Sequence, residues 1–347
     1  MRAVVLHGDR HVSVDEVPDA EVPGPDGLLL RVERTAICGS DLHLYHGPMT
    51  IPGVHLGHEF VGTVEEVGSA VTTVGKGDRV LVSGVIGCGH CAPCRAGDVV
   101  VCANAGTKVF GTSLELAGGQ AEAVGVPAAD ASVVRIPEEI TDEQAVLLTD
   151  ILPTGYLGAQ RADIHPGDTV VVIGLGPVGV FALQCAQLYG PSRILAVDMV
   201  PDRLARAELL GAEPIDATGG DTVAKIHEAT GGRGAQAVIE AVGADQTISD
   251  AILCAAAGGT ISVVGVNLNF GLPFPMPVAL MKRLTFRVTI AAIPTTWPAL
   301  FPLVTSGRLR PETVVTHRLG LSDAADAYRM FDAHDPGVLK ILLDPTA

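Results

Sequence analysis

The stretch TVVVIGLGPVG, Thr169 to Gly179, decides the fold of the second half of this chain. Its first five residues are all β-branched, which predicts a buried strand over 169–173. Glycines in the spacing G-x-G-x-x-G then permit a tight turn, a close approach to a pyrophosphate, and close packing of a helix expected from about Pro177 to Tyr189. The helix N-terminus offers its N–H groups to the anion. This turn predicts a dinucleotide site with contacts from Gly174, Gly176, Pro177, Val178 and Gly179.

Strands and helices continue to alternate after this motif. A strand over 193–198 precedes a helix over 201–210, and further apolar strands are expected over 237–243 and 260–266. Apolar strands that alternate with helices are typical of a doubly wound parallel sheet. The predicted fold class is therefore α/β.

Asp198 ends the second of these strands, 19 residues after Gly179. A carboxylate at this place accepts the hydroxyls of the adenosine ribose and repels a 2′-phosphate, which favours NAD(H) over NADP(H). The alternative is a solvated turn residue without a ligand. The strand, glycine turn, helix and acidic residue together favour cofactor binding.

Residues 1 to about 155 have a different pattern, in which short β segments are separated by turn signals such as 23–27 and 74–78. The expected segments are 12–15, 28–32, 59–67, 78–82 and 131–136. Their spacing predicts a barrel-like β domain whose loops carry the metal-binding motifs described below.

The length and charge of the chain limit what it can be. A chain of 347 residues exceeds what one hydrophobic core usually supports, so two domains are expected. A net charge of −16 disfavours a nucleic-acid groove or an anionic membrane as partner. The longest apolar run, 170–183, is too short and too rich in glycine to span a membrane, and the N-terminus lacks a signal-peptide core. We expect a cytoplasmic protein with reduced thiols.

Four of the seven cysteines lie within one short segment, at Cys88, Cys91, Cys94 and Cys102. Three thiolates at three-residue steps and a fourth eight residues later can surround one Zn²⁺ tetrahedrally. The alternative is a thiol-rich surface loop. Four thiolates leave no position for a substrate, so this zinc is expected to be structural.

Cys38, in CGSDLH, and His58, in GHE, form a second constellation upstream of the cysteine segment. One thiolate and one imidazole make half of an open zinc site, which needs a third ligand. Taken alone, two such residues are more often a buried cysteine and a hydrogen-bonded core histidine than metal ligands.

Taken together, these motifs resemble the zinc-containing medium-chain alcohol dehydrogenases over nearly the whole chain. The shared features are GHE followed by FVGTV, the four-cysteine lobe, LTDILPTGY from Leu148, the glycine motif, and VLKIL from Val338. The resemblance implies a GroES-like β-barrel catalytic domain over 1–154, with the structural-zinc lobe at about 88–102. It also implies an NAD-binding Rossmann domain over 155–290 and a segment over 291–347 that returns to the catalytic domain.

The resemblance also implies a second, catalytic zinc, and thus two Zn²⁺ per subunit. Its ligands would be Cys38, His58 and Asp150; many relatives have cysteine at the last of these positions. Glu59 would lie behind the zinc and swing in as a transient ligand. Asp41 would be the carboxylate that orients His58.

Further roles follow from the same resemblance. Ser40 would hydrogen-bond the alcohol oxygen and His43 would pass its proton to solvent. Contacts to NAD are implied for Thr154, Arg203, Val264, Val266 and Lys340, although Arg203 is equally explained as a surface cation.

The implied reaction interconverts an alcohol and its ketone or aldehyde by hydride transfer to NAD. Gly84, where relatives often have a larger pocket residue, suggests a secondary or bulky alcohol, with Phe110 as the opposite wall. A formaldehyde or aldehyde dehydrogenase and a polyol dehydrogenase are the alternatives within the family. A non-enzymatic zinc- and NAD-binding regulator is disfavoured by the intact Ser40–His43 pair. The apolar stretch 284–293 predicts an exposed sheet edge and therefore a homo-oligomer, a tetramer by family resemblance.

Overall fold

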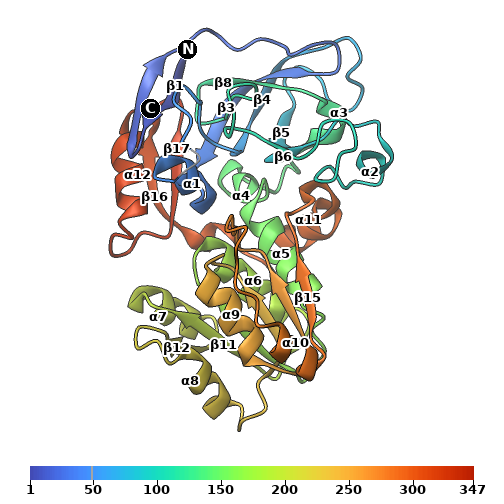
Figure 1. Cartoon of the computed structure of the whole chain (residues 1–347). Coiled ribbons are helices and arrows are strands. Elements are labelled where there is room, and N and C mark those ends of the chain that lie inside the picture. The colour runs from blue at the N-terminus through green and yellow to red at the C-terminus, as the bar shows by residue number, and fades with distance from the viewer. Residues whose placement is uncertain (48–49) are drawn as a thin grey trace. The chain divides into compact units, whose positions relative to one another are not determined.

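The computed structural model describes residues 1–47 and 50–347, which form two compact units. The first unit comprises Met1–Pro153 together with Ala291–Ala347, and the second comprises Thr154–Ile290 (Figure 1). No helix within the described ranges is long and apolar enough to cross a membrane.

The second unit is built on one six-stranded sheet in which every neighbouring pair of strands is parallel. In spatial order its strands are β12 (Glu213–Asp216), β11 (Arg193–Asp198), β10 (Thr169–Ile173), β13 (Ala235–Glu240), β14 (Ala255–Val263) and β15 (Thr285–Val288). Its helices are α6 (Pro177–Gln187), α7 (Pro201–Leu209), α8 (Thr222–Ala229), α9 (Asp245–Cys254) and α10 (Met276–Lys282), and α5 (Ile151–Arg161) leads into it. The predicted α/β fold class with a doubly wound sheet is confirmed.

The strand order places a ligand site at one end of this sheet. From β10 the chain moves outward to β11 and β12, and it then returns to β13 on the other side of β10. In open parallel sheets ligands bind beyond the carboxyl ends of the strands where the order reverses. Gly174 follows β10 and Ala241 follows β13, so the glycine turn lies at the reversal.

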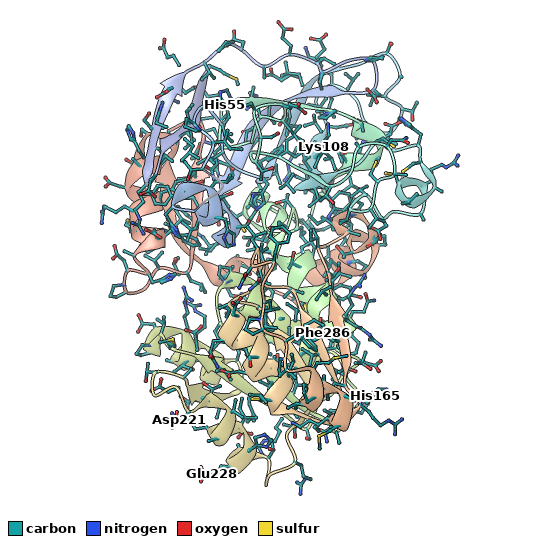
Figure 2. All side chains as sticks on the ribbon, viewed as in Figure 1. His55, Lys108, His165, Asp221, Glu228 and Phe286 are labelled. Atoms are coloured by element: carbon teal, nitrogen blue, oxygen red, sulfur yellow. The ribbon has the colours of Figure 1, made fainter. Side chains whose placement is uncertain are left out.

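β15 is one of the two edge strands of this sheet, and β12 is the other. Phe286 of β15, labelled in Figure 2, packs edge-on against Phe274 with ring centroids 5.2 Å apart. This strand, Thr285–Val288, is shorter than the predicted stretch 284–293. At its start the Leu284 amide bonds to Ala279 O at the end of α10, and beyond its end Ile293 begins a 3₁₀ turn.

The first unit contains a sheet in the order β16-β17-β3-β4-β5-β9, with β8 also paired to β3. Its strands are β3 (Leu28–Ala36), β4 (Glu59–Val67), β5 (Arg79–Val82), β8 (Ala123–Val126), β9 (Val133–Arg135), β16 (Val315–Gly320) and β17 (Lys340–Asp344). Two small sheets pair β1 (Arg2–Gly8) with β2 (His11–Glu16) and β6 (Val85–Ile86) with β7 (Lys108–Val109). Because β17 pairs with β3, the C-terminal segment completes the sheet begun by the N-terminal residues.

Short helices lie between and after these strands. They are α1 (Leu42–Tyr45), α2 (Ala92–Arg95), α3 (Ala129–Ser132), α4 (Asp142–Val146), α11 (Trp297–Thr305) and α12 (Ala324–Asp332). The strand expected over 131–136 was wrong in its first part, where α3 is found instead. There the Asp130 carboxylate accepts hydrogen bonds from Thr72 and Thr73, which holds this segment in a helical turn.

Candidate active site

Two neighbouring strands and the start of a helix bring Cys38, His58 and Asp150 together. Ala36 pairs with Glu59 across β3 and β4, so Cys38, just after β3, lies beside His58, just before β4. Asp150 immediately precedes α5. The ligand atoms of these residues and of Glu59 all lie within 4.8 Å of one another. Residues 112 positions apart in the sequence (150 − 38) are thus assembled by the fold.

The distances within this group fit a zinc ion. Cys38 Sγ lies 3.6 Å from Asp150 Oδ2, and His58 Nε2 lies 3.3 Å from the same oxygen. Around a tetrahedral zinc with ordinary bond lengths, sulfur and oxygen ligands are about 3.6 Å apart and nitrogen and oxygen ligands about 3.4 Å. The donor set therefore has the size and chemistry of a zinc site, to which Cys38, His58, Asp150 and Glu59 can each offer one atom.

Burial and neighbouring charges shift the pKa values of two members of this group. Burial disfavours the imidazolium, but Asp41 and Cys38 outweigh it and raise the pKa of His58 well above its usual value. Burial and the neighbouring Glu59 raise the pKa of the Cys38 thiol. A metal ion that binds here has to displace the protons of its ligands.

Asp41 and Ser40 belong to one 3₁₀ turn, Gly39–Asp41, beside the ligands. Asp41 Oδ1 lies 3.1 Å from His58 Nδ1, which leaves Nε2 facing the ligand group. Ser40 Oγ lies 3.3 Å from Cys38 Sγ and 3.2 Å from His58 Nε2. The predicted positions of Asp41 behind His58 and of Ser40 beside the metal ligands agree with this geometry.

His43 lies on α1, one turn further along the chain, and is half-buried. Burial, followed by the nearby His46, lowers the pKa of His43. Within residues 1–47 and 50–347 no hydrogen bond joins Ser40 directly to His43. A proton path between them therefore needs an intervening hydroxyl or water.

Lys340, which the sequence predicts as a cofactor contact, lies beside Glu59 in the structure. Lys340 is fully buried, and its Nζ donates to Glu59 Oε1 at 2.7 Å and to Ile37 O at 2.8 Å. Burial disfavours its charge, but Glu59 overcomes this and raises the pKa of Lys340. Lys340 is thus the counter-ion of Glu59. A lone lysine in the apolar strand β17 was the sequence signal for such a buried partner.

The two carboxylate oxygens of Glu59 differ in their hydrogen bonding. Its Oε1 is held by Lys340, whereas the buried Oε2 has no hydrogen-bond partner among the described residues. Because Glu59 belongs to the ligand group, an unsatisfied oxygen here is consistent with the expectation of a residue behind the zinc.

Gly84 and Phe110 do not form the substrate pocket that the sequence suggested. A Cβ added to Gly84 would lie 2.7 Å from His58 O, so packing against the backbone explains this glycine. Phe110 is fully buried in the barrel core, edge-on to Phe60 with ring centroids 5.0 Å apart. These contacts give no support to a substrate-pocket wall at either residue.

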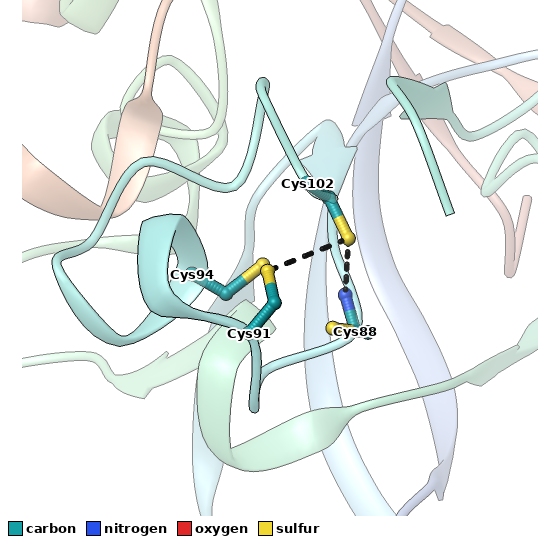
Figure 3. A group of neighbouring side chains, drawn as sticks. All are labelled: Cys88, Cys91, Cys94 and Cys102. Atoms are coloured by element: carbon teal, nitrogen blue, oxygen red, sulfur yellow. Dashed lines mark hydrogen bonds between the residues drawn. The ribbon is translucent and has the colours of Figure 1, made fainter. Parts of the chain in front are cut away.

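The four cysteines form a separate group in one loop around α2 (Figure 3). Cys91 Sγ and Cys102 Sγ are 3.9 Å apart, close to the roughly 3.8 Å between two thiolates on one tetrahedral zinc. Backbone N–H groups of Cys88 and Ala105 donate to Cys102 Sγ at 3.3 Å each. These bonds, led by that of Cys88, lower the pKa of Cys102 to about 6, whereas burial raises the pKa of Cys94 to about 12. The group fits a closed structural zinc.

The glycine turn of the second unit has the geometry that its motif requires. Gly174 has a φ of +88°, and a Cβ there would lie 2.4 Å from Val242 Cγ2. A Cβ on Gly179 would lie 1.7 Å from Gly174 O. Both positions therefore disfavour a side chain, whereas a Cβ on Gly176, the N-cap of α6, would meet nothing within 4 Å. This open side of the turn fits the approach of a phosphate to the helix N-terminus.

Asp198 is fixed against this turn. Its Oδ2 accepts from the Leu175 amide at 2.7 Å, and its Oδ1 accepts from the amides of Met199 and Val200 at 2.7 and 2.9 Å. Arg203 Nη1 lies 3.8 Å from Asp198 Oδ2, and the Arg203 side chain is only 18% exposed. Arg203 is thus a neighbour of the acidic residue and not a freely solvated cation.

The remaining predicted cofactor residues lie on nearby segments of the same unit. Val264 and Val266 follow β14, and Thr154, the first residue of the unit, lies on α5. The sequence did not single out Glu240 at the end of β13. This buried carboxylate accepts from the amides of Val242 and Gly243 and from Thr247, and so shapes the turn opposite Gly174. Glu240 could have been identified from the sequence as an acidic residue in an otherwise largely apolar strand.

Comparison with known proteins decides the family. The model of the alcohol dehydrogenase GroES-like domain matches residues 24–138, and that of the zinc-binding dehydrogenase matches residues 177–306. The "probable zinc-binding alcohol dehydrogenase" of Mycobacterium tuberculosis is 48% identical over 347 residues, covering 99% of this chain and 89% of its own length. The chain belongs to the zinc-containing medium-chain alcohol dehydrogenases.

Other relatives agree with this assignment. A zinc-type alcohol dehydrogenase-like protein of Bacillus subtilis is 36% identical and covers 99% of this chain and 100% of its own length. The solved structure of an alcohol dehydrogenase from Thermus sp. ATN1 superposes with a TM-score of 0.92, at 41% identity and with 99% of each chain covered. This alcohol dehydrogenase is therefore a zinc-dependent oxidoreductase with a GroES-like domain.

Proposed function

We propose that this enzyme interconverts an alcohol and its carbonyl compound, with NAD(H) as the hydride carrier, at the site formed by Cys38, His58 and Asp150. The observation that carries the proposal is the donor set itself, whose 3.6 and 3.3 Å edges fit zinc. Three protein ligands leave one side of the ion open to a substrate, unlike the four-cysteine group.

The residues around this site have separate tasks. When bound, zinc supplies Lewis acidity to the alcohol oxygen, and NAD supplies the acceptor for the hydride. The Ser40 hydroxyl, beside Cys38 and His58, takes the alcohol proton and passes it towards His43. Because its pKa is lowered, His43 remains neutral near pH 7 and can accept that proton.

The test of the reaction is an absorbance assay for NADH with a panel of primary, secondary and polyhydric alcohols and of aldehydes. We expect NAD-dependent oxidation of at least one alcohol and no activity in the Asp150→Ala variant. Oxidation of aldehydes alone would instead place the enzyme with formaldehyde dehydrogenase-like members of the family. No turnover of any substrate by a zinc-loaded enzyme would overturn the proposal.

The proposed preference for NAD(H) is supported by the position of Asp198 at the glycine turn. Hydrogen bonds to a charged group contribute about 1.5–3 kcal/mol, so Asp198→Ala should raise the KM for NAD⁺ about tenfold or more and reduce discrimination against NADP⁺. Arg203→Ala is the matched control. If Arg203 bound the 2′-phosphate of NADP⁺, this variant would use NADP⁺ less well than the parent enzyme does. A parent enzyme that prefers NADP⁺ would contradict the assignment.

We further propose that the protein is a homo-oligomer, and a tetramer by family resemblance. Support comes from the edge strand β15 and the adjoining helix α10, where Val288 is 62% exposed and Met281 is 84% exposed. Pairing this edge with a second copy would remove unpaired backbone groups and cover the apolar side chains. Analytical ultracentrifugation should find an oligomer that Val288→Lys dissociates; a monomer at micromolar concentration would contradict the proposal.

A further inference from the structure

A buried polar cluster lies behind the zinc ligand His58, and two of its members come from distant parts of the chain. Asp41 belongs to the 3₁₀ turn beside Cys38, Gln120 precedes β8, and Tyr328 lies on α12 in the C-terminal segment. Asp41 is 1% exposed, and Gln120 and Tyr328 are fully buried. Polar groups at this depth are costly unless they are hydrogen-bonded, so their contacts define what the cluster does.

All the donors of the cluster converge on one oxygen of Asp41. Asp41 Oδ2 receives the Cys38 amide at 3.0 Å, the Tyr328 hydroxyl at 3.3 Å and Gln120 Nε2 at 3.4 Å. Its other oxygen, Oδ1, faces His58 Nδ1 at 3.1 Å, an ion-pair distance at which the two atoms do not have hydrogen-bond geometry. The donors therefore decide which oxygen points towards the histidine.

Tyr328 and Gln120 also fix each other. The Tyr328 hydroxyl lies 2.9 Å from Gln120 Oε1, and Gln120 Nε2 donates to Ala36 O at 3.1 Å. These two bonds determine the orientation of the amide. A hydroxyl carries one proton, so Tyr328 supports Asp41 either directly or through Gln120, and both routes end at Oδ2.

We infer that Tyr328 is a positioning residue for the catalytic zinc, which acts with Gln120 to hold Asp41 so that His58 presents Nε2 to the metal. The inference rests on the proposed zinc site. It explains why a helix from the C-terminal segment carries a polar group into the core behind that site. Residues behind a metal ligand typically change metal affinity or activity about 10–100-fold when they are mutated.

The expected effect follows from the number of donors left on Oδ2. Tyr328→Phe keeps the ring and leaves Gln120 and the Cys38 amide in place, so release of the catalytic metal should accelerate about tenfold, at the low end of that range. Tyr328→Phe combined with Gln120→Met leaves only the Cys38 amide and should accelerate release about 100-fold. Gln120→Met alone provides a second variant with an effect similar to that of Tyr328→Phe.

The chain offers a matched control in Tyr45. This tyrosine is buried in the same apolar cluster, and its ring centroid lies 5.3 Å from that of Tyr328. It donates no hydrogen bond to Asp41 within the described ranges. Tyr45→Phe therefore removes a hydroxyl from the same core without changing the support of His58.

The experiment measures zinc release from the full-length protein with a chromogenic chelator, together with the visible spectrum of the Co²⁺-substituted enzyme. We expect faster release from the catalytic site and an altered cobalt spectrum in Tyr328→Phe, with unchanged release from the four-cysteine site and with Tyr45→Phe equal to the parent. Release at the parent rate, or equal acceleration at both sites, would overturn the inference. A parent that holds no metal at Cys38, His58 and Asp150 would overturn the proposed function itself.

Discussion

The two metal sites of this enzyme are built in opposite ways. The four-cysteine group draws its ligands from the short segment between Cys88 and Cys102, and backbone amides of the same loop bond to its sulfur atoms. The catalytic group draws Cys38, His58 and Asp150 from three separate elements and is supported by Asp41, Ser40 and the Lys340–Glu59 pair. The ligands of the first group are local in the sequence, whereas those of the second are assembled from distant segments. With Cys38, His58 and Asp150 as its proposed ligands, the second site would keep one position open for chemistry.

The largest expected effect comes from removal of a catalytic ligand. Asp150→Ala should reduce activity to background and the zinc content from two ions per chain to one. The two ligands that remain, Cys38 and His58, are too few to hold the ion. The fold should persist, since the Asp150 side chain is 20% exposed and contributes little to the core. Metal analysis and circular dichroism check both points. Activity that survives the loss of this zinc would remove the functional distinction between the two sites.

Ser40→Ala separates proton transfer from metal binding. The hydroxyl lies beside the ligands without belonging to the donor set, so turnover should fall by about 10²–10⁴-fold while both zinc ions remain. Steady-state kinetics together with zinc analysis tests this expectation. If the variant instead loses zinc, Ser40 supports the ligands and does not transfer the proton.

Cys91→Ser tests the other site. Loss of the four-thiolate zinc should lower the melting temperature, by roughly 10 °C if a few kilocalories per mole are lost, because structural zinc contributes folding free energy. Activity per folded molecule should stay near that of the parent at low temperature. A variant that is as stable as the parent would show that this loop needs no metal.

His43→Gln should lower turnover less than Ser40→Ala does, by about 10²-fold or less, because water can replace a residue one step away from the reacting oxygen. Burial and His46 lower the pKa of His43, so the ring is a proton acceptor down to mildly acidic pH. The loss of turnover in His43→Gln should be greatest just above that pKa. It should become smaller as pH rises, because the alcohol then loses its proton without a base from the protein. A pH–rate profile measures this, and a deficit that grows towards alkaline pH would reassign His43.

The same contrast explains what could be predicted from the sequence. The cysteine lobe and the glycine turn are local, so ligand spacing, a φ of +88° at Gly174 and close packing at Gly179 follow from a few consecutive residues. The bounds predicted for β10 and β11, 169–173 and 193–198, are those of the structure. The strand predicted over 260–266 spans Ala255–Val263 instead, and β12 was not predicted. The fold class and the family were therefore within reach of pattern and resemblance.

Contacts between segments that are distant in the sequence could not be predicted. Lys340 was assigned to the cofactor because its spacing matches relatives, whereas strand pairing between β17 and β3 directs it to Glu59. The substrate role suggested for Gly84 was wrong because an absent side chain does not reveal whether space or backbone lies beyond it. The hydrogen bonds of Tyr328 and Gln120 could not be predicted, because the sequence of an amphipathic helix or of a loop does not show which distant residue a side chain contacts.

The central claim is that one metal site performs chemistry and the other holds structure. The most direct test is to incubate the parent enzyme with a chelator while recording zinc release, activity and circular dichroism in the same sample. We predict two zinc ions per chain that leave in two phases, with activity lost in the faster phase and the secondary structure retained until the slower one. One zinc per chain, or activity that disappears only with the slower phase, would contradict this account.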